Sequence, residues 1–445
     1  MSNQEKTYIF RTYGCQMNEH DTEIMEGMLK ELGYTPTEDE ATADLVIFNT
    51  CSVRENADNK VFGEIGRMKN IKRDNPNMLL ALCGCMAQQQ TVVDKILRSY
   101  PHVDMVFGTH NIHRLPDLIE QAVFSRETIV DVWQTEGEII EHLPRSRKDG
   151  MKAWVTIMYG CNNFCTYCIV PYTRGRERSR APEQIISEIE QLKADGYKEV
   201  TLLGQNVNSY GLDLDEEIDF PDLLEKIDQI GIERIRFMTS HPKDFTDKLI
   251  DVIKHSKHIC EQIHLPFQAG SNEVLRRMNR KHTREWYLEK IKNIKEKIPN
   301  VSLSTDIIVG FPEETEEQFL DTIDIVRQVE YDMAYTFIYS PREGTSAAKL
   351  EDTISNIEKK QRLQQLIDVQ NEIVKRKNME YLGKKVEILV EGRSKTNPNK
   401  LTGRTRSNKI VHFTGDDNLI GQLVEVFIET VKTWSLEGVY TDDQL

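Results

Sequence analysis

The chain has 445 residues and a formal net charge of −15, and 39% of its residues are hydrophobic and 29% charged. This composition is typical of a soluble globular protein with about two to four domains. No run of about 18 apolar residues is present, so no membrane span is predicted, and the first residues lack the basic and apolar regions of a secretion signal. The acidic balance does not suggest a nucleic-acid partner, although a local basic patch can still bind phosphate.

The first part of the chain alternates strand-like and helix-like segments. Strands are predicted at 7–13, 45–50, 78–83 and 103–107, and helices at 18–32, 55–73, 87–98 and 111–123. The run at 45–50 is continuously apolar, as expected for a strand that is buried on both faces. The pattern predicts an α/β fold that begins with a doubly wound parallel sheet, in a domain of residues 5–145.

Eight cysteines in a chain of this kind favour metal binding or catalysis over disulfides. Cys15, Cys51 and Cys85 each lie one or two residues past the end of a different predicted strand. Because the carboxyl ends of parallel strands share an edge of the sheet, these thiols are predicted to meet there as a three-thiolate cluster. The alternative is three unrelated cysteines. Cys83 lies inside an apolar run and Cys260 stands alone, so both are interpreted as packing residues.

The middle of the chain, residues 146–375, repeats the strand–helix alternation six times. Strands are predicted at 153–158, 199–203, 234–238, 262–265, 302–309 and 333–338, with helices at 182–195, 221–230, 244–255, 283–298 and 316–329. The pattern predicts a partial (β/α)6 barrel, whose active site would be built from the loops that follow the strands. Polar or glycine-rich residues stand at those loops, among them Gln205, Ser240, Gln268, Asp306 and Gly310. His241 and His264 are interpreted as structural histidines without a catalytic role.

The first of these loops contains Cys161, Cys165 and Cys168, spaced as C-x₃-C-x₂-C. Structural zinc takes four ligands, and neither a second cysteine pair nor a trailing histidine pair lies nearby. Iron–sulfur clusters are held by cysteine thiolates, and three local thiolates leave the fourth iron of a cubane open for chemistry. The alternative of three packing thiols fits poorly, because Asn162 and Thr166 make the loop polar.

A basic segment follows the cysteine loop. Four arginines occur within seven residues, at Arg174, Arg176, Arg178 and Arg180. Beside a candidate active site they would suit a phosphate-rich substrate. The alternative is an ordinary solvated charge run.

A polar helix is predicted at 361–377, and after it, in the last segment of residues 376–445, the strand–helix alternation ends. Short alternating strands are predicted at 386–390, 401–404, 410–413, 423–430 and 434–440, which indicates a small antiparallel β-barrel. Between 393 and 415 there are six basic residues and no acid, including Lys400, Arg404 and Arg406. A basic stripe on a small barrel resembles sequence-tolerant nucleic-acid binders. The alternative is a charged β-surface with no partner.

Taken together, these motifs resemble the radical S-adenosylmethionine (SAM) methylthiotransferase family over essentially the whole chain. The resemblance rests on the cysteine loop at 160–168 and on the sequences TYGCQMN at 12–18, NTCSVR at 49–54 and CGCMA at 83–87. The C-terminal barrel is similar to the TRAM RNA-binding domain. Within the family, GCQMNE at 14–19 and YTRGRE at 172–177 most resemble the branch that modifies isopentenyladenosine beside the tRNA anticodon.

The resemblance implies cofactors and their binding residues. Two [4Fe–4S] clusters are implied, one held by Cys161, Cys165 and Cys168 and chelated by SAM at its open iron, and an auxiliary one held by Cys15, Cys51 and Cys85. SAM contacts are implied at Tyr167, Gln205, Ser240, Gln268, Asp306 and Gly310. RNA contacts are expected at Arg174, Arg176, Arg178, Lys400, Arg404 and Arg406. No catalytic side chain is expected beyond the cluster ligands.

The implied reaction inserts sulfur and a methyl group at adenine C-2. That C–H bond is not acidic enough for a side-chain base, so a one-electron route is needed, and cofactors carry such chemistry. Family chemistry implies that reductive cleavage of SAM gives a 5′-deoxyadenosyl radical, which abstracts the hydrogen. The implied partners are tRNA and an external reductant such as flavodoxin or ferredoxin, for a cytoplasmic monomer without membrane contact. Alternatives are a sibling substrate (threonylcarbamoyl-adenosine in tRNA, or a ribosomal-protein aspartate) and a non-enzymatic iron–sulfur protein that binds RNA.

Overall fold

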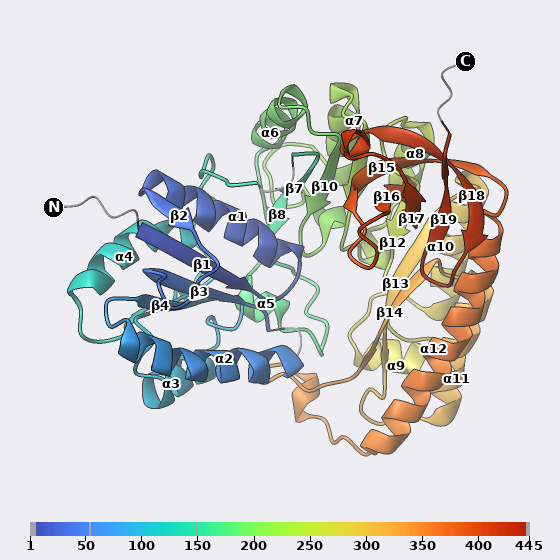
Figure 1. The fold of residues 1–445 in the computed structure, drawn as a ribbon. Coiled ribbons are helices and arrows are strands. Elements are labelled where there is room, and N and C mark those ends of the chain that lie inside the picture. Colours follow the sequence, from blue (N-terminus) through green and yellow to red (C-terminus); the bar gives the residue numbers. More distant parts are fainter. Residues whose placement is uncertain (1–5, 53–54, 148–149, 442–445) are drawn as a thin grey trace.

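The computed structural model describes residues 6–52, 55–147 and 150–441, and in these ranges the chain forms three units along its length (Figure 1). A parallel sheet with helices on both faces comes first, an open barrel of parallel strands follows, and a small closed β-barrel comes last. Within the described ranges, no helix is long and apolar enough to cross a membrane.

The N-terminal unit is a six-stranded parallel sheet in the order β2-β1-β3-β4-β5-β6. Its strands are β1 (Lys6–Thr12), β2 (Tyr34–Pro36), β3 (Leu45–Thr50), β4 (Leu79–Gly84), β5 (Met105–Phe107) and β6 (Ile129–Asp131). Helices α1 (Gln16–Glu31) and α4 (Leu115–Phe124) pack on one face, and α2 (Glu55–Asp74) and α3 (Gln90–Ser99) on the other. The predicted doubly wound sheet is therefore confirmed. Strands β2 and β6 were not predicted, because three residues at a sheet edge are too few for a periodic pattern.

The middle unit contains six parallel strands in sequence order. They are β7 (Lys152–Thr156), β10 (Glu199–Leu203), β11 (Arg234–Phe237), β12 (Gln262–His264), β13 (Ser302–Val309) and β14 (Met333–Ile338). The first three and the last three form two sheets, which the parallel bridge between Ile235 and Ile259 joins. Among the described residues β7 and β14 are not paired, so the barrel stays open, as predicted.

Helices surround this open barrel. They are α6 (Pro182–Ala194), α7 (Phe220–Ile230), α8 (Asp247–His255), α10 (Arg284–Lys297), α11 (Glu316–Val329) and the long α12 (Asn356–Met379). Two short helices were not predicted, α5 (Val170–Thr173) after the cysteine loop and α9 (Asn272–Arg277). The strand predicted at 153–158 ends earlier, since Met158–Tyr159 pairs as β8 with β9 (Arg178–Ser179) in an antiparallel ribbon.

The C-terminal unit is a closed barrel in the order β15-β16-β17-β19-β18. Its strands are β15 (Lys385–Arg393), β16 (Leu401–Thr405), β17 (Ile410–Thr414), β18 (Leu423–Val431) and β19 (Leu436–Tyr440). Four of the five pairs are antiparallel as predicted, whereas β17 and β19 are parallel. A closed ring with an odd number of strands cannot alternate direction all the way round, so one parallel pair is unavoidable.

Buried arginines attach this small barrel to the amino ends of the middle strands. Arg234, whose side chain is 1% exposed, donates to the carbonyl of Arg404 at 2.7 Å and to the Glu387 carboxylate at 2.9 Å. Arg236 donates to the carbonyls of Thr405 and Arg406 at 2.9 and 2.8 Å. The small barrel therefore lies at the opposite end of the strands from the cysteine loop, which follows the carboxyl end of β7.

Replacing Arg234 by Ala is expected to lower the free energy of unfolding by about 2 kcal/mol, because the carbonyl of Arg404 loses its buried donor. Lys198→Ala serves as a matched control, since the Lys198–Glu233 pair is half exposed and 3.7 Å apart and should contribute less than about 0.5 kcal/mol. Denaturant unfolding of both variants measures the difference. Equal stabilities would contradict the structural role of Arg234.

Candidate active site

The structure brings the three N-terminal strand-end cysteines together. Cys15 is the N-cap residue of α1, Cys51 directly follows β3, and Cys85 directly follows β4. The hydrogen bond between Cys51 and Cys15 is the main cause that lowers the pKa of Cys15 to about 6. Burial raises the pKa of Cys85, and the charge of Cys15 adds to that rise. These three thiols, which we call the first triad, share one edge of the sheet.

Cys161, Cys165 and Cys168, the second triad, lie on a loop that is held at several points. The amide of Cys168 donates to the carbonyl of Cys165 at 2.9 Å, which turns the loop back on itself. The side chain of Thr166 donates to the carbonyl of Arg277 at 2.8 Å. The Gln205 side chain accepts a hydrogen bond from the amide of Gly160. Gln205 therefore holds the loop and does not line the cavity described below.

Each triad begins directly after a glycine with positive φ. Gly14 has φ +144°, and a Cβ there would lie 2.7 Å from the Cβ of Cys51. Gly160 has φ +77°, and a Cβ there would lie 1.9 Å from the carbonyl oxygen of Arg176. Only glycine fits such positions without strain, so both cysteine loops depend on a close backbone approach.

The chemistry of both triads fits iron–sulfur groups. Burial raises the pKa of Cys161 to about 11 and that of Cys168 to about 12. Iron binds the thiolate, and its positive charge would compensate for this desolvation. Side-chain N–H groups already donate to sulfur, from Asn163 to Cys161 and from Arg280 to Cys165, each at 3.5 Å.

A single metal ion fits less well. In the parts of the chain that the structure describes, no three His, Cys, Asp or Glu side chains are placed to share one ion. A cubane cluster takes each thiolate on a different iron, so its ligands need not converge on one point.

One arginine from the segment after the second triad contacts a thiol of the first. Arg174 leaves the end of α5, six residues after Cys168, and its Nε donates to the Sγ of Cys85 at 3.2 Å. Its Nη2 donates to Asp21 on α1 at 2.7 Å, and the two side chains are only 5% and 4% exposed. The expectation that Arg174 contacts RNA is therefore corrected, because its guanidinium is buried against an acid and a thiol.

The other arginines of this segment are placed differently from one another. Arg176 is exposed, and its guanidinium lies 4.4 Å from the ring centre of Phe164 in the cysteine loop. Arg178 is partly buried and donates to the carbonyl of Gly137. Arg180 is buried and donates to Glu188 at 2.9 Å. The run of four is thus not one continuous basic surface.

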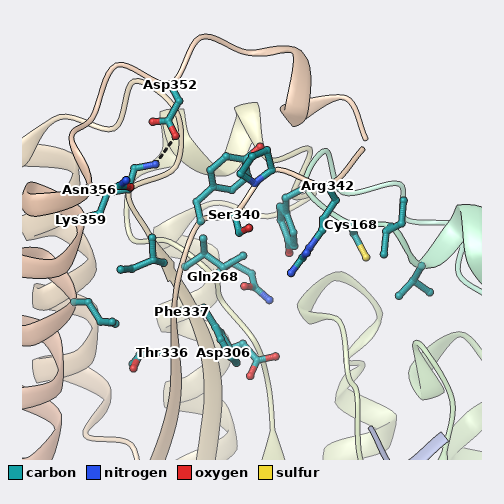
Figure 2. Close-up of a pocket in the computed structure, with 18 residues that line it drawn as sticks. Cys168, Gln268, Asp306, Thr336, Phe337, Ser340, Arg342, Asp352, Asn356 and Lys359 are labelled. Atoms are coloured by element: carbon teal, nitrogen blue, oxygen red, sulfur yellow. Dashed lines mark hydrogen bonds and ion pairs between the residues drawn. The ribbon is translucent and has the colours of Figure 1, made fainter. Parts of the chain in front are cut away.

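A cavity of about 720 Å³ opens beside the second triad (Figure 2). Cys168, Tyr167, Gln268 and Asp306 line it, so three of the six expected SAM contacts lie at one cavity. Figure 2 shows Cys168 and Arg342 on one side and Asp352, Asn356 and Lys359 on the other. This volume suits a ligand of small-molecule or cofactor size.

The remaining expected contacts, Ser240 and Gly310, do not line this cavity. The Ser240 hydroxyl is buried without a hydrogen-bond partner among the described residues. A Cβ at Gly310 would lie 2.6 Å from the side chain of Lys359, which itself lines the cavity. The sequence reasoning missed Arg342, although it follows the end of β14 and the strand-end rule would have found it. Lys359 lies inside α12, where no sequence signal marks it.

The expected RNA contacts on the small barrel are paired with acids. Lys400 donates to Glu437 at 2.7 Å, and Arg404 lies 3.3 Å from Glu391. Arg406 donates to Glu261 of the middle unit at 2.8 and 2.9 Å, and so belongs to the contact between the two units. Any phosphate that reached these cations would compete with the paired acid.

Comparison with known proteins gives matches over nearly the whole chain. Residues 155–326 match the family model described as Radical SAM superfamily, 7–108 match Uncharacterized protein family UPF0004, and 380–441 match the TRAM domain. The protein called tRNA-2-methylthio-N(6)-dimethylallyladenosine synthase of Anoxybacillus flavithermus is 57% identical, over 100% of this chain and 84% of its own length. The same-named protein of Geobacillus thermodenitrificans is 56% identical, over 100% and 85%.

Solved structures resemble this one in fold alone. The radical S-adenosylmethionine methyltransferase TsrM from Kitasatospora setae matches with a TM-score of 0.57 at 12% identity, over 78% of this chain and 77% of that one. The cobalamin-dependent radical enzyme OxsB matches with a TM-score of 0.52 at 11% identity, over 83% and 56%.

Gly160→Ala is expected to reduce the iron bound after anaerobic reconstitution to about half, because the new Cβ would displace the loop of the second triad, whereas the three thiols of the first lie on the N-terminal unit. Iron and sulfide analysis measures the loss. Gly63→Ala is the matched control: Gly63 lies in α2 with nothing within 4 Å of the added Cβ, and should gain about 0.5–1 kcal/mol of stability. Full iron content in Gly160→Ala would contradict the role given to this glycine.

Proposed function

This chain belongs to the radical SAM methylthiotransferase family, and from that premise we propose that it is a tRNA methylthiotransferase acting on N(6)-isopentenyladenosine next to the anticodon. It would add sulfur and a methyl group at C-2 of the adenine. The observation that carries the proposal is the pair of cysteine triads, one on each of two units, with Arg174 in contact with Cys85 of the first.

The residues that would hold the cofactors follow from their positions. Cys161, Cys165 and Cys168 would hold one [4Fe–4S] cluster, and Cys15, Cys51 and Cys85 would hold a second. SAM would occupy the 720 Å³ cavity, whose wall includes Cys168, Tyr167, Gln268 and Asp306. When bound, these groups supply the one-electron chemistry that an unactivated adenine C–H bond requires.

Several side chains of the protein would position the cluster and its loop. Gln205 and Thr166 hold the cysteine loop, while Asn163 and Arg280 donate N–H groups to its sulfurs. Such donors around a cluster fix its ligands and influence its electronic properties. Ile308, Phe337 and Tyr339 give the cavity an apolar and aromatic wall. We assign no general acid or base.

The three units would divide the task. Residues 5–145 would carry the auxiliary cluster, 146–375 the SAM chemistry, and 376–445 a TRAM barrel that contacts tRNA. The proposed setting is a cytoplasmic monomer that receives electrons from an external reductant such as flavodoxin or ferredoxin. Of the six expected RNA contacts, exposed Arg176 next to the cysteine loop keeps the strongest support.

Mass spectrometry of tRNA nucleosides tests the substrate. A strain that lacks this gene should lose 2-methylthio-isopentenyladenosine and accumulate isopentenyladenosine, and the intact gene should restore the mark. The threonylcarbamoyl-adenosine marks serve as the internal control and should not change. Loss of the thiomethyl group from the threonylcarbamoyl mark, with the isopentenyl mark intact, would overturn the substrate assignment.

The non-enzymatic alternative is tested on the reconstituted protein. The reduced protein should release 5′-deoxyadenosine from SAM and bind about eight irons, falling to about four when either triad is changed to alanine. A protein that binds tRNA without cleaving SAM, or that never holds more than one cluster, would contradict the proposal.

The small barrel makes a separate prediction. Lys400→Ala with Arg404→Ala should weaken tRNA binding and reduce the slope of log affinity against log salt by about 0.7–0.9 for each phosphate that the variant no longer neutralises. Arg406→Ala should instead loosen the contact to Glu261 and leave the slope unchanged. SAM cleavage without tRNA serves as the control and should stay intact. An unchanged slope in the double variant would rule out these cations as phosphate contacts.

A further inference from the structure

The contact of Arg174 with Cys85 is the one place, among the described residues, where a cation from the loop region of the second triad touches a thiol of the first. The Nε–Sγ distance is 3.2 Å, and Asp21 accepts from the same guanidinium at 2.7 Å. All three side chains are buried. Buried charges are screened less by salt than exposed ones, so both charges act on the nearby sulfur.

Hydrogen bonds hold the backbone on both sides of this contact. The amide of Arg174 donates to the carbonyl of Val170 at 2.8 Å, which closes the single turn of α5. The hydroxyl of Thr109, from the N-terminal unit, donates to the carbonyl of Thr173 at 2.6 Å. Asp21 lies on α1, six residues after Cys15. The backbone on both sides of the contact is thus fixed by hydrogen bonds.

Arg174 makes two kinds of contribution to a sulfur that binds iron. An N–H donated to a ligand sulfur withdraws electron density, and a nearby positive charge favours the more negative, reduced state of a cluster; both raise its reduction potential. The Asp21 carboxylate, 2.7 Å from the guanidinium, opposes the second effect. The pair therefore presents two neighbouring charges of opposite sign to one thiol.

We propose that Arg174 is a positioning residue that orients the Cys85 sulfur and, with Asp21, sets the reduction potential of the cluster that the first triad would hold. This inference rests on the proposed function, because it needs that cluster. It goes beyond that function in giving one residue of the middle unit control over the cofactor of the N-terminal unit. Since the same segment also carries Cys168, the geometry of one triad is tied to that of the other.

The charge argument predicts opposite effects for the two partners. Arg174→Gln removes a positive charge and the Nε–H group that donates to Cys85, so the reduction potential should fall. Asp21→Asn removes a negative charge with little change in shape, so the potential should rise. The double variant Arg174→Gln with Asp21→Asn leaves no unpaired buried charge. Its reduction potential should lie between those of the two single variants. A purely structural role would move both single variants in the same direction.

The experiment uses the full-length chain with Cys161, Cys165 and Cys168 changed to alanine, so that only the first triad can load. After anaerobic reconstitution, a redox titration followed by electron paramagnetic resonance gives the midpoint potential. Arg174→Lys keeps the charge but loses the planar guanidinium donor. Its midpoint potential should therefore fall by less than that of Arg174→Gln. Arg98→Gln is the matched control, because Arg98 is exposed on α3 and donates to the carbonyl of Asp94.

Opposite shifts for the two single variants, with no shift for Arg98→Gln, would establish the inference. Unchanged potentials, or shifts of both single variants in the same direction, would overturn it. If Arg174→Gln does not fold, the charge-neutral double variant and Arg174→Lys still give potentials to compare with Asp21→Asn. A chain that holds both clusters and shows these shifts, yet leaves tRNA unmodified, would contradict the proposed function alone.

Discussion

Parallel strand pairing places every carboxyl end of a sheet on the same edge, and the first cysteine triad depends on this constraint. In the N-terminal sheet the register pairs Thr12 with Asn49 and Thr50 with Gly84, so the residues that follow β1, β3 and β4 leave the sheet side by side. Successive thiols that are about 35 residues apart in sequence meet for that reason alone. The second triad instead lies on a single loop, beyond the carboxyl end of β7 and the short strand β8.

The units are joined by paired charges that are mostly buried. Arg174 pairs with Asp21 across the first contact, and Arg234 and Arg236 donate to backbone carbonyls of the small barrel across the second. A buried charge costs a great deal unless it is paired and hydrogen-bonded, so each contact tolerates only a narrow range of orientations. The same property makes these arginines suited to positioning. The donors of a guanidinium have fixed directions, so they restrict the relative orientation of two segments more than an apolar contact does.

The basic residues show how far charge patterns can be interpreted. Arg174 and Arg176 are two positions apart in one run, but the first is buried on a thiol and the second is exposed over Phe164. On the small barrel, Arg406 holds the barrel to Glu261 of the middle unit. A sequence records where cations occur, whereas the direction of each side chain is decided by acids that are distant in sequence, such as Asp21 and Glu261.

The sequence by itself determined the order of the longer strands and helices and the grouping of six cysteines into two sets of three, because the period of apolar residues and the strand-end rule depend only on local order. Leu45–Thr50, Glu199–Leu203 and Ser302–Val309 were predicted to the residue. Only the tertiary structure decided that Gln205 holds the cysteine loop, that Lys359 reaches the cavity, and that Arg174 contacts Cys85 of the first triad. Each of these contacts joins segments that are far apart in the chain. Tertiary packing brings such segments together, and no local sequence pattern specifies that packing.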